Sequence, residues 1–161
     1  MKISVLSKRD SFELIEIIKK KWPQHILPRV KTFKAYEIEQ GKRILKSEKF
    51  TAIQINQDMV LPFLGEPNII SQFPQVIVDM GAVKFVCNGA KVMRPGITKF
   101  DTFKKGDIVI VKDQIYHKTL ATGIAIEDSE IAASSSKGYV IDNLHYISDK
   151  FWEAHKEISA S

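Results

Sequence analysis

The chain has 161 residues, of which 44% are hydrophobic and 27% charged, and its formal net charge is +5. This length allows one ordinary domain or two small ones, with enough apolar material for a packed core. The single cysteine, Cys87, excludes an intrachain disulfide and is typical of a small core residue. No apolar run reaches the roughly 18 residues that a membrane span needs. We therefore expect a cytoplasmic protein that is neither exported nor inserted into a membrane.

The basic excess lies entirely in the first half of the sequence. Residues 1–73 contain 13 Lys and Arg against 8 Asp and Glu, whereas residues 74–161 contain 11 of each. The basic residues of the first half are interleaved with Trp22, Phe33 and Tyr36. Such a mixture suits phosphates with occasional base stacking, but an ordinary solvated helix face with lysine-rich turns has the same composition.

The N-terminal half begins with helical spacing and continues with strand-like alternation. Residues 11–22 have apolar positions at helical spacing, with Ser11 as the capping residue, acids early and lysines late, and Pro23 ends this helix. From Val30 to Pro62 the pattern alternates as in strands, with polar breaks at residues 40–42 and 56–58. We expect a helix packed on a small antiparallel sheet.

The segment from residue 64 to residue 74 separates the two halves. It contains Pro67, Pro74 and Gly65, which are residues typical of a break between structural units. It is also short and apolar, unlike a flexible linker. The sequence therefore predicts a domain boundary in this segment, near residue 73.

Residues 78–97 carry the most informative pattern of the chain. Asp79 is placed to accept hydrogen bonds from the amides of a short helix over residues 80–88, and Gly89 supplies its end. Residues 90–93 then predict a strand. The following Arg94-Pro95-Gly96 predicts a turn, in which proline sets φ and glycine tolerates a positive one.

Three further blocks make this half similar to a known family. Residues 105–111 predict a Gly-Asp turn followed by a central strand, and residues 121–125 predict a strand of alternating small and aliphatic residues. Residues 138–152 predict a last strand and a closing turn. Together with residues 78–97, these blocks resemble the PUA domain, an RNA-binding pseudo-barrel. The resemblance gives His145 and Trp152 a structural role in closing the barrel.

The N-terminal half is similar to the pre-PUA domain of the malignant T-cell-amplified sequence and ligatin-type translation factors, and above all to their archaeal stand-alone relatives. This similarity rests on the helix, the basic β-meander, the segment Leu61–Leu64, and Phe73-Pro74 leading into Val78-Asp79. It implies an α+β protein, with a small N-terminal α/β pre-PUA domain over residues 1–73 packed on a C-terminal PUA pseudo-β-barrel over residues 74–155. Residues 156–161 would form a tail. Nothing after Ser161 resembles an initiation-factor-like module, so we expect another protein to supply that activity.

The sequence gives little support to catalysis. The histidines His25, His117, His145 and His155 lack the paired spacing of a zinc site, and neither a GxxxxGK[ST] nor a GxGxxG motif occurs. The serine cluster at residues 134–136 is typical of a polar turn before a strand. We expect a protein that is not an enzyme and that has no metal and no cofactor.

The resemblance also implies where RNA would bind. In PUA domains the RNA runs along the groove between the first helix and the strand that follows it. The matching positions here are Gly81, Lys84, Asn88, Lys91, Met93, Arg94, Pro95 and Gly96. Recognition of this kind uses phosphate and 2′-hydroxyl contacts over a shape, with low sequence specificity.

Three functions remain open at this point. The first is a non-catalytic RNA-binding protein of the translation apparatus that docks on small-subunit rRNA or on a tRNA acceptor end. Its partners would be the small ribosomal subunit and an initiation-factor-like protein. The second is a targeting subunit that presents tRNA or rRNA to a modifying enzyme. The third is a protein-interaction domain whose basic half binds an acidic partner.

Overall fold

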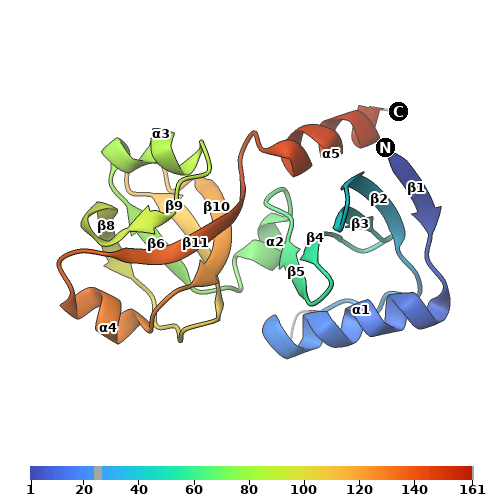
Figure 1. The fold of residues 1–161 in the computed structure, drawn as a ribbon, viewed down its shortest axis with the longest axis horizontal. Helices are drawn as coiled ribbons and strands as arrows, with labels where there is room; N and C mark the ends of the chain where they lie inside the picture. The colour runs from blue at the N-terminus through green and yellow to red at the C-terminus, as the bar shows by residue number, and fades with distance from the viewer. Residues whose placement is uncertain (24–26, 161) are drawn as a thin grey trace. The chain divides into compact units, whose positions relative to one another are not determined.

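The computed structural model describes residues 1–23 and 27–160, and the chain forms two compact units (Figure 1). The first unit is Met1–Gln72 together with the C-terminal segment from Lys150, and the second is Phe73–Asp149. No helix among the described residues is long and apolar enough to cross a membrane.

A five-stranded antiparallel sheet with the order β1-β2-β3-β4-β5 forms the centre of the first unit. The strands are β1 (Lys2–Val5), β2 (Lys34–Glu39), β3 (Lys42–Lys46), β4 (Thr51–Asn56) and β5 (Met59–Pro62). The last four confirm the alternation that the sequence shows over residues 30–62. The sequence does not predict β1, because all four of its residues are exposed and none of them marks a buried face.

Helix α1 (Lys8–Lys21) begins earlier than its sequence pattern predicts. The capping residue is Ser7, whose Oγ accepts a hydrogen bond from the Asp10 amide at 3.0 Å, so the expectation of Ser11 as the cap is wrong. Ser11 is instead buried, and its Oγ accepts from the Phe33 amide at 3.1 Å. The helix ends before Pro23, as predicted.

Two further helices complete the first unit, namely α2 (Pro67–Ile70) and α5 (Lys150–Ala160). Phe151 and Ile158 of α5 join a buried cluster with strand residues of the sheet. The Trp152 ring stacks on Phe63 with 5.5 Å between the centroids. Trp152 therefore packs within the first unit, which corrects its expected place in the closing block of the barrel.

The second unit is a six-stranded sheet with the order β7-β11-β10-β9-β6-β8. Its strands are β6 (Gln75–Val78), β7 (Val92–Met93), β8 (Ile97–Phe100), β9 (Ile108–Asp113), β10 (Thr119–Ala125) and β11 (Tyr139–Tyr146). The two edge strands, β7 and β8, are joined by the short 3-10 turn η3 (Arg94–Gly96). The two edges of the sheet therefore meet at η3, and the sheet nearly closes into a barrel. This confirms the predicted α+β class and its pseudo-barrel.

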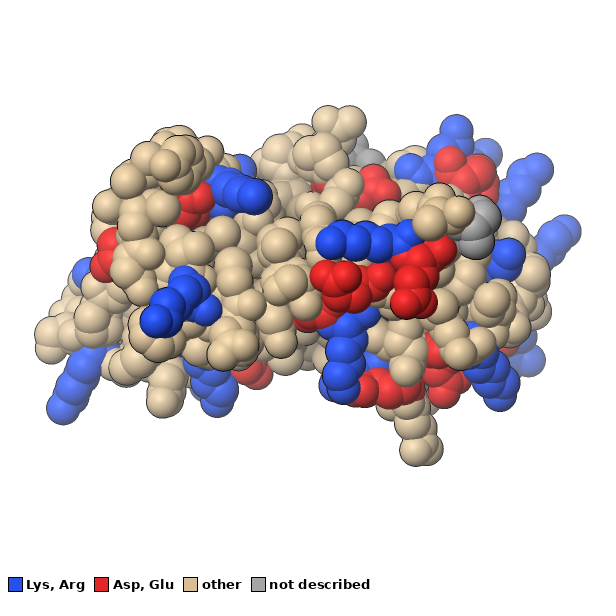
Figure 2. Space-filling view, turned by 90° about the horizontal axis from the view of Figure 1, so that it is seen from above, with Lys and Arg blue, Asp and Glu red and all other residues tan. Residues whose placement is uncertain are grey.

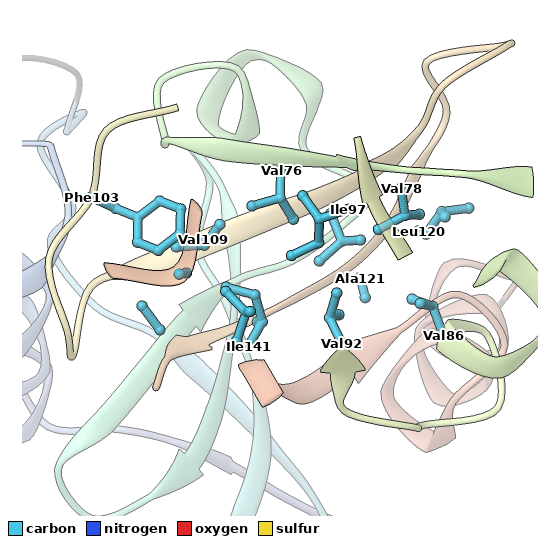
Figure 3. Close-up of a cluster of buried hydrophobic side chains, with 14 residues drawn as sticks. Val76, Val78, Val86, Val92, Ile97, Phe103, Val109, Leu120, Ala121 and Ile141 are labelled. Carbon is cyan, nitrogen blue, oxygen red and sulfur yellow. The ribbon is translucent and has the colours of Figure 1, made fainter. Parts of the chain in front are cut away.

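The interior of this barrel is filled by aliphatic side chains from all around the sheet. Figure 3 shows Phe103 and Val86 at opposite ends of this cluster, with valines and isoleucines between them. Gly123 of β10 lies where a Cβ atom would overlap the carbonyl oxygen of Asp142 on β11, so only glycine allows these strands to approach. His145 is fully buried, and its Nδ1 lies 2.7 Å from Asp149 Oδ2, in keeping with a structural role.

Two short helices flank the barrel. They are α3 (Val83–Val86) and α4 (Ser129–Ser134), which lie at opposite ends of the second unit in Figure 1. Ser134 and Ser135 donate their hydroxyl hydrogens to the carbonyls of Glu130 and Ile131 at 2.8 and 2.9 Å. Ser134 therefore ends α4 and Ser135 caps it, so the turn before the strand begins later than the predicted residue 134.

Candidate functional site

The candidate site is built around the short helical segment that follows β6. This segment opens with the 3-10 turn η2 (Met80–Ala82) and continues as α3. The Asp79 carboxylate accepts from the Ala82 amide at 3.0 Å, as its capping position predicts. The Asp79 amide donates to the Gly96 carbonyl at 2.9 Å. Asp79 thus ties the start of this segment to η3, the turn that closes the barrel.

The end of α3 is fixed from two directions. Gly89 has a φ of +91°, in keeping with a turn there, but α3 ends earlier than the predicted residue 88, at Val86 with Cys87 as its cap. The Asn143 side-chain amide on β11 donates to the carbonyls of Val86 and Ala90 at 2.9 and 3.0 Å. The Val86 carbonyl also accepts from the Gly89 amide at 3.1 Å, and Asn143 adds a side-chain contact that joins β11 to the end of the helix and to the turn after it. No local pattern in the sequence indicates this contact, because 57 residues separate Asn143 from Val86.

A cavity of about 300 Å³ lies between this helical segment and η3. Ala82 and Val86 line one side of it, and β7 with η3 forms the other. Four of the predicted site residues, Lys91, Met93, Pro95 and Gly96, belong to its lining, together with Asp79 and Val92. The structure therefore places half of the predicted set around one hollow.

The rim of the cavity carries an exposed aromatic residue that the site prediction missed. Tyr139 on β11 pairs directly with Met93 on β7, and their side chains are 56% and 50% exposed. Lys91 Nζ lies 5.5 Å from the centroid of the Tyr139 ring. Lys91, Met93 and Tyr139 are referred to below as the rim. They place a cation, a thioether and a phenol ring side by side, which is a composition suited to stacking on a base next to a phosphate.

Three of the predicted residues are exposed outside the cavity. They are Gly81, Lys84 and Asn88 on η2, α3 and the turn after it. Lys84 Nζ lies 5.5 Å from the centroid of Phe85, which is 59% exposed. This pair repeats the combination of a lysine and an aromatic ring on the outer side of the helix.

Arg94 does not present its charge to solvent as expected. One terminal nitrogen of its guanidinium donates to the Ile97 carbonyl at 3.0 Å and the other to the Ala133 carbonyl at 3.3 Å. The guanidinium carbon also lies 4.9 Å from the Phe100 ring centroid. Arg94 therefore joins η3 to β8 and α4, and its side chain is engaged within the protein.

Gly96 is glycine for a reason other than the predicted one. It does not have a positive φ, unlike Gly89 and Gly138. A Cβ atom at this position would lie 3.3 Å from the Ala82 Cβ, across the narrow part of the cavity. Gly96 thus allows η3 to approach the helical segment closely.

The charges of the surface are dispersed. On the face shown in Figure 2, Lys and Arg side chains stand apart from one another, with uncharged surface and acidic groups between them. Within the described residues, no group of three or more His, Cys, Asp or Glu side chains is placed to hold a metal ion, and His25 lies outside these residues. A ligand on this face therefore meets separate positive charges rather than a continuous basic strip.

Comparison with known protein families supports the barrel assignment. The family model described as the PUA domain matches residues 74–147, which cover β6 through β11 and hence the whole cavity. Residues 74–147 belong to the PUA domain family. The PUA domain brings β7, η3 and α3 of this chain together around one hollow.

Individual relatives extend the similarity. Translation machinery-associated protein 20 of Saccharomyces cerevisiae is 34% identical over 87 residues, which are 50% of this chain and 48% of that protein. Malignant T-cell-amplified sequence 2 of Homo sapiens is 31% identical over 99 residues, which are 56% of this chain and 55% of that protein. The matched part thus spans about half the length of these relatives. The chain is homologous to both protein groups, which confirms the predicted resemblance.

A solved structure covers both units of the chain. The crystal structure of a hypothetical protein from the hyperthermophilic archaeon Pyrococcus horikoshii matches 95% of this chain and 99% of its own, with 28% identity and a TM-score of 0.79. The first unit is therefore part of a shared architecture that also includes the PUA domain.

Proposed function

We propose that this protein is an RNA-binding component of the translation apparatus, and that it holds RNA at the cavity beside α3. The single observation that carries this proposal is the hollow between α3 and η3 with the cation and aromatic rim of Lys91, Met93 and Tyr139. The matched PUA family and the relative named translation machinery-associated protein 20 support it.

The cavity has the dimensions and chemistry for one nucleotide rather than for a helix. Its volume of about 300 Å³ lies at the small end of ligand pockets. Its apolar floor, from Ala82, Val86 and Val92, suits a base or a ribose, and Asp79 at its edge disfavours a phosphate inside. We propose that a base or ribose enters the cavity while Lys91 contacts the adjacent phosphate. The Asp79 carboxylate would accept from a 2′-hydroxyl or an exocyclic amino group.

The outer side of α3 would extend this contact. Lys84 and Phe85 are both exposed there, so the RNA backbone leaving the cavity would pass over them. Gly81 and Asn88 would allow close approach to the helix, and Pro95 and Gly96 would shape the opposite wall. The first unit would act as a pre-PUA domain that contacts the small ribosomal subunit or an initiation-factor-like protein.

The test is direct binding to RNA at several salt concentrations, followed by cosedimentation with small ribosomal subunits. Lys91→Ala should weaken RNA binding about 5-fold, equivalent to ~1 kcal/mol, because a phosphate loses its cation. Lys99→Ala is the matched control, because Lys99 is equally exposed on β8 but does not line the cavity. Equal effects of the two variants would contradict the cavity as the binding site.

Two alternatives make different predictions in the same experiment. A subunit that presents tRNA or rRNA to a modifying enzyme would prefer free tRNA or rRNA fragments over the small ribosomal subunit. A protein-interaction domain would bring down neither RNA nor ribosomal subunits, and nuclease treatment would leave its partners bound.

A further inference from the structure

The loop between β9 and β10 is held rigid by a buried acid. The Asp113 carboxylate, only 2% exposed, accepts hydrogen bonds from the backbone amides of Ile115, Tyr116 and Lys118 at 3.0, 2.6 and 3.0 Å. Burial alone would raise the pKa of Asp113, but these amides outweigh it and lower the pKa below its usual value. Asp113 therefore stays ionised and fixes the shape of the loop.

This rigid loop exposes two large apolar side chains to solvent. Tyr116 is 75% exposed and Ile115 is 59% exposed. A single exposed aromatic residue needs no explanation, but here a buried carboxylate is used to hold one in a fixed position. His117, with a φ of +52°, completes the tight turn. The loop is therefore a preorganised platform rather than a flexible connection.

The loop also adjoins the candidate RNA site. The Gln114 amide donates to the Val78 carbonyl at 3.0 Å, immediately before Asp79. Burial raises the pKa of the Cys87 thiol, at the end of α3, and Lys118 lies near enough to offset part of this effect. Val86 faces the cavity, and the next residue, Cys87, lies about 100° farther around the helix. The cavity and the loop thus flank different sides of α3.

We propose that Tyr116 is a second RNA contact, which stacks on an unpaired nucleotide after the RNA strand has passed from the cavity over α3. The charges of the loop favour RNA as its occupant. Lys112 and Lys118 flank Tyr116 in the sequence, and the nearest acid, Asp113 at the end of β9, is buried and bound by amides. Stacking on an aromatic ring is tolerant of sequence and needs only an accessible base face.

This inference rests on the proposed function and gives it a substrate class. An RNA that reaches from the cavity to Tyr116 must have single-stranded nucleotides, because the bases of a duplex are stacked on one another and are not free. The RNA would therefore be a single-stranded end or loop next to a helix. A uniform duplex would contact only Lys84 and Lys91.

The test compares two RNA hairpins with the same stem. One is blunt, and the other carries a four-nucleotide single-stranded 3′ extension with 2-aminopurine at one position. We expect the wild-type protein to prefer the extended hairpin. Tyr116→Ala should weaken that binding about 10-fold and abolish the change in 2-aminopurine fluorescence, while leaving the blunt hairpin unaffected. Tyr116→Phe should retain both signals, since it keeps the ring.

Two controls separate this inference from the proposed function. Ile131→Ala removes another exposed apolar side chain, 51% exposed, from α4, and should change nothing. If Lys91→Ala weakens binding of the extended hairpin and Tyr116→Ala does not, the second contact is overturned and the cavity stands. If neither variant changes RNA binding, both proposals fail. If Tyr116→Ala weakens both hairpins equally, stacking on an unpaired base is overturned.

Discussion

The two compact units divide charge and surface chemistry between them. The half of the sequence that forms most of the first unit has the basic excess, 13 Lys and Arg against 8 Asp and Glu. The half that contains the barrel has 11 of each, yet it carries the cavity, the rim and the exposed Phe85 and Tyr116. Net charge alone thus indicates the other half of the chain than the one that carries the candidate site.

The difference teaches that the arrangement of charges matters more than their sum. In the first unit, several cations serve local structure. Lys19 pairs with Glu16, and Lys42 and Lys150 both contact Glu39, whose pKa they lower to about 2. In the barrel, Lys84 and Lys91 lie over exposed aromatic rings, whereas the ring of Tyr36 beneath Lys34 in the first unit is buried. A lysine next to an exposed ring is available to a ligand, whereas one in an ion pair is already engaged.

The largest expected effect separates the stabilities of the two units. Gly123→Ala should destabilise the barrel by about 3 kcal/mol, because its Cβ would force β10 away from Asp142 on β11. Urea unfolding followed by circular dichroism measures this. Fluorescence reports on the first unit, since Trp22 and Trp152 both belong to it. Equal shifts in both signals would show that the units unfold together.

The control for this variant lies in the same unit. Gly81→Ala would place a Cβ at 3.4 Å from Asp79 Oδ1, an ordinary contact, with no positive φ to strain it. Its stability should stay within about 0.5 kcal/mol of the wild type.

A smaller effect distinguishes the two kinds of basic residue within the barrel. Arg94→Ala should destabilise the protein by about 2 kcal/mol, because the Ile97 and Ala133 carbonyls lose a charged donor and Phe100 loses its packing partner. Thermal unfolding of this variant beside Lys99→Ala provides the measurement. A wild-type melting temperature for Arg94→Ala would contradict this structural role and make the guanidinium a candidate RNA contact again.

Salt dependence compares the units as RNA-binding surfaces. Each phosphate contact on single-stranded RNA contributes about 0.7 to the slope of log K against log salt. Replacing Lys84 and Lys91 together by Ala should therefore reduce the slope by about 1.4. Replacing Lys20 and Lys21, which are exposed in the last turn of α1, should leave it unchanged. The reverse result would indicate that RNA binds to the basic first unit.

The smallest effect concerns pH and the first unit. Burial, and secondarily Lys46, lowers the pKa of His155 below its usual 6.5, and its ring lies 4.2 Å from the Phe63 ring centroid. The unfolded chain therefore takes up this proton first, so stability is full above pH 6.5 and falls as the pH decreases below it. Melting temperatures from pH 8 to pH 5 should decline less steeply for His155→Gln. Parallel curves would contradict a contribution from His155.

Local signals predicted much of the fold. Asp79 caps its helical segment, Gly89 has a positive φ in the turn after α3, and the alternation over residues 30–62 becomes β2 to β5. These features depend on hydrogen bonds and periodicities within a few residues, so the sequence contains them directly. The sequence also indicated four residues that line the cavity.

The features that the sequence did not predict depend on distant partners. Arg94 resembles any basic residue before a proline until Ala133, 39 residues away, provides a carbonyl. Tyr139 becomes part of the site only through its pairing with Met93. The sequence pattern assigns residues 150–155 to the barrel and 156–161 to a tail, because the docking of α5 depends on Phe63 and β2, which lie far away in the sequence. Ser7 and Ser11 are both plausible caps, and only the buried contact of Ser11 with Phe33 decides between them.

The turn η3 joins the two edges of the barrel and also forms one wall of the cavity. Two backbone hydrogen bonds connect η3 to its neighbours. The Gly96 carbonyl accepts from the Asp79 amide at 2.9 Å, and the Arg94 amide donates to the Gly138 carbonyl at 2.8 Å. A molecule bound in the cavity would therefore stabilise these hydrogen bonds where the barrel closes. Amide hydrogen exchange at Asp79 and Arg94 should slow on binding, even though neither backbone amide touches the ligand. Hydrogen exchange at these two amides would then report binding in the cavity, without any label on the RNA.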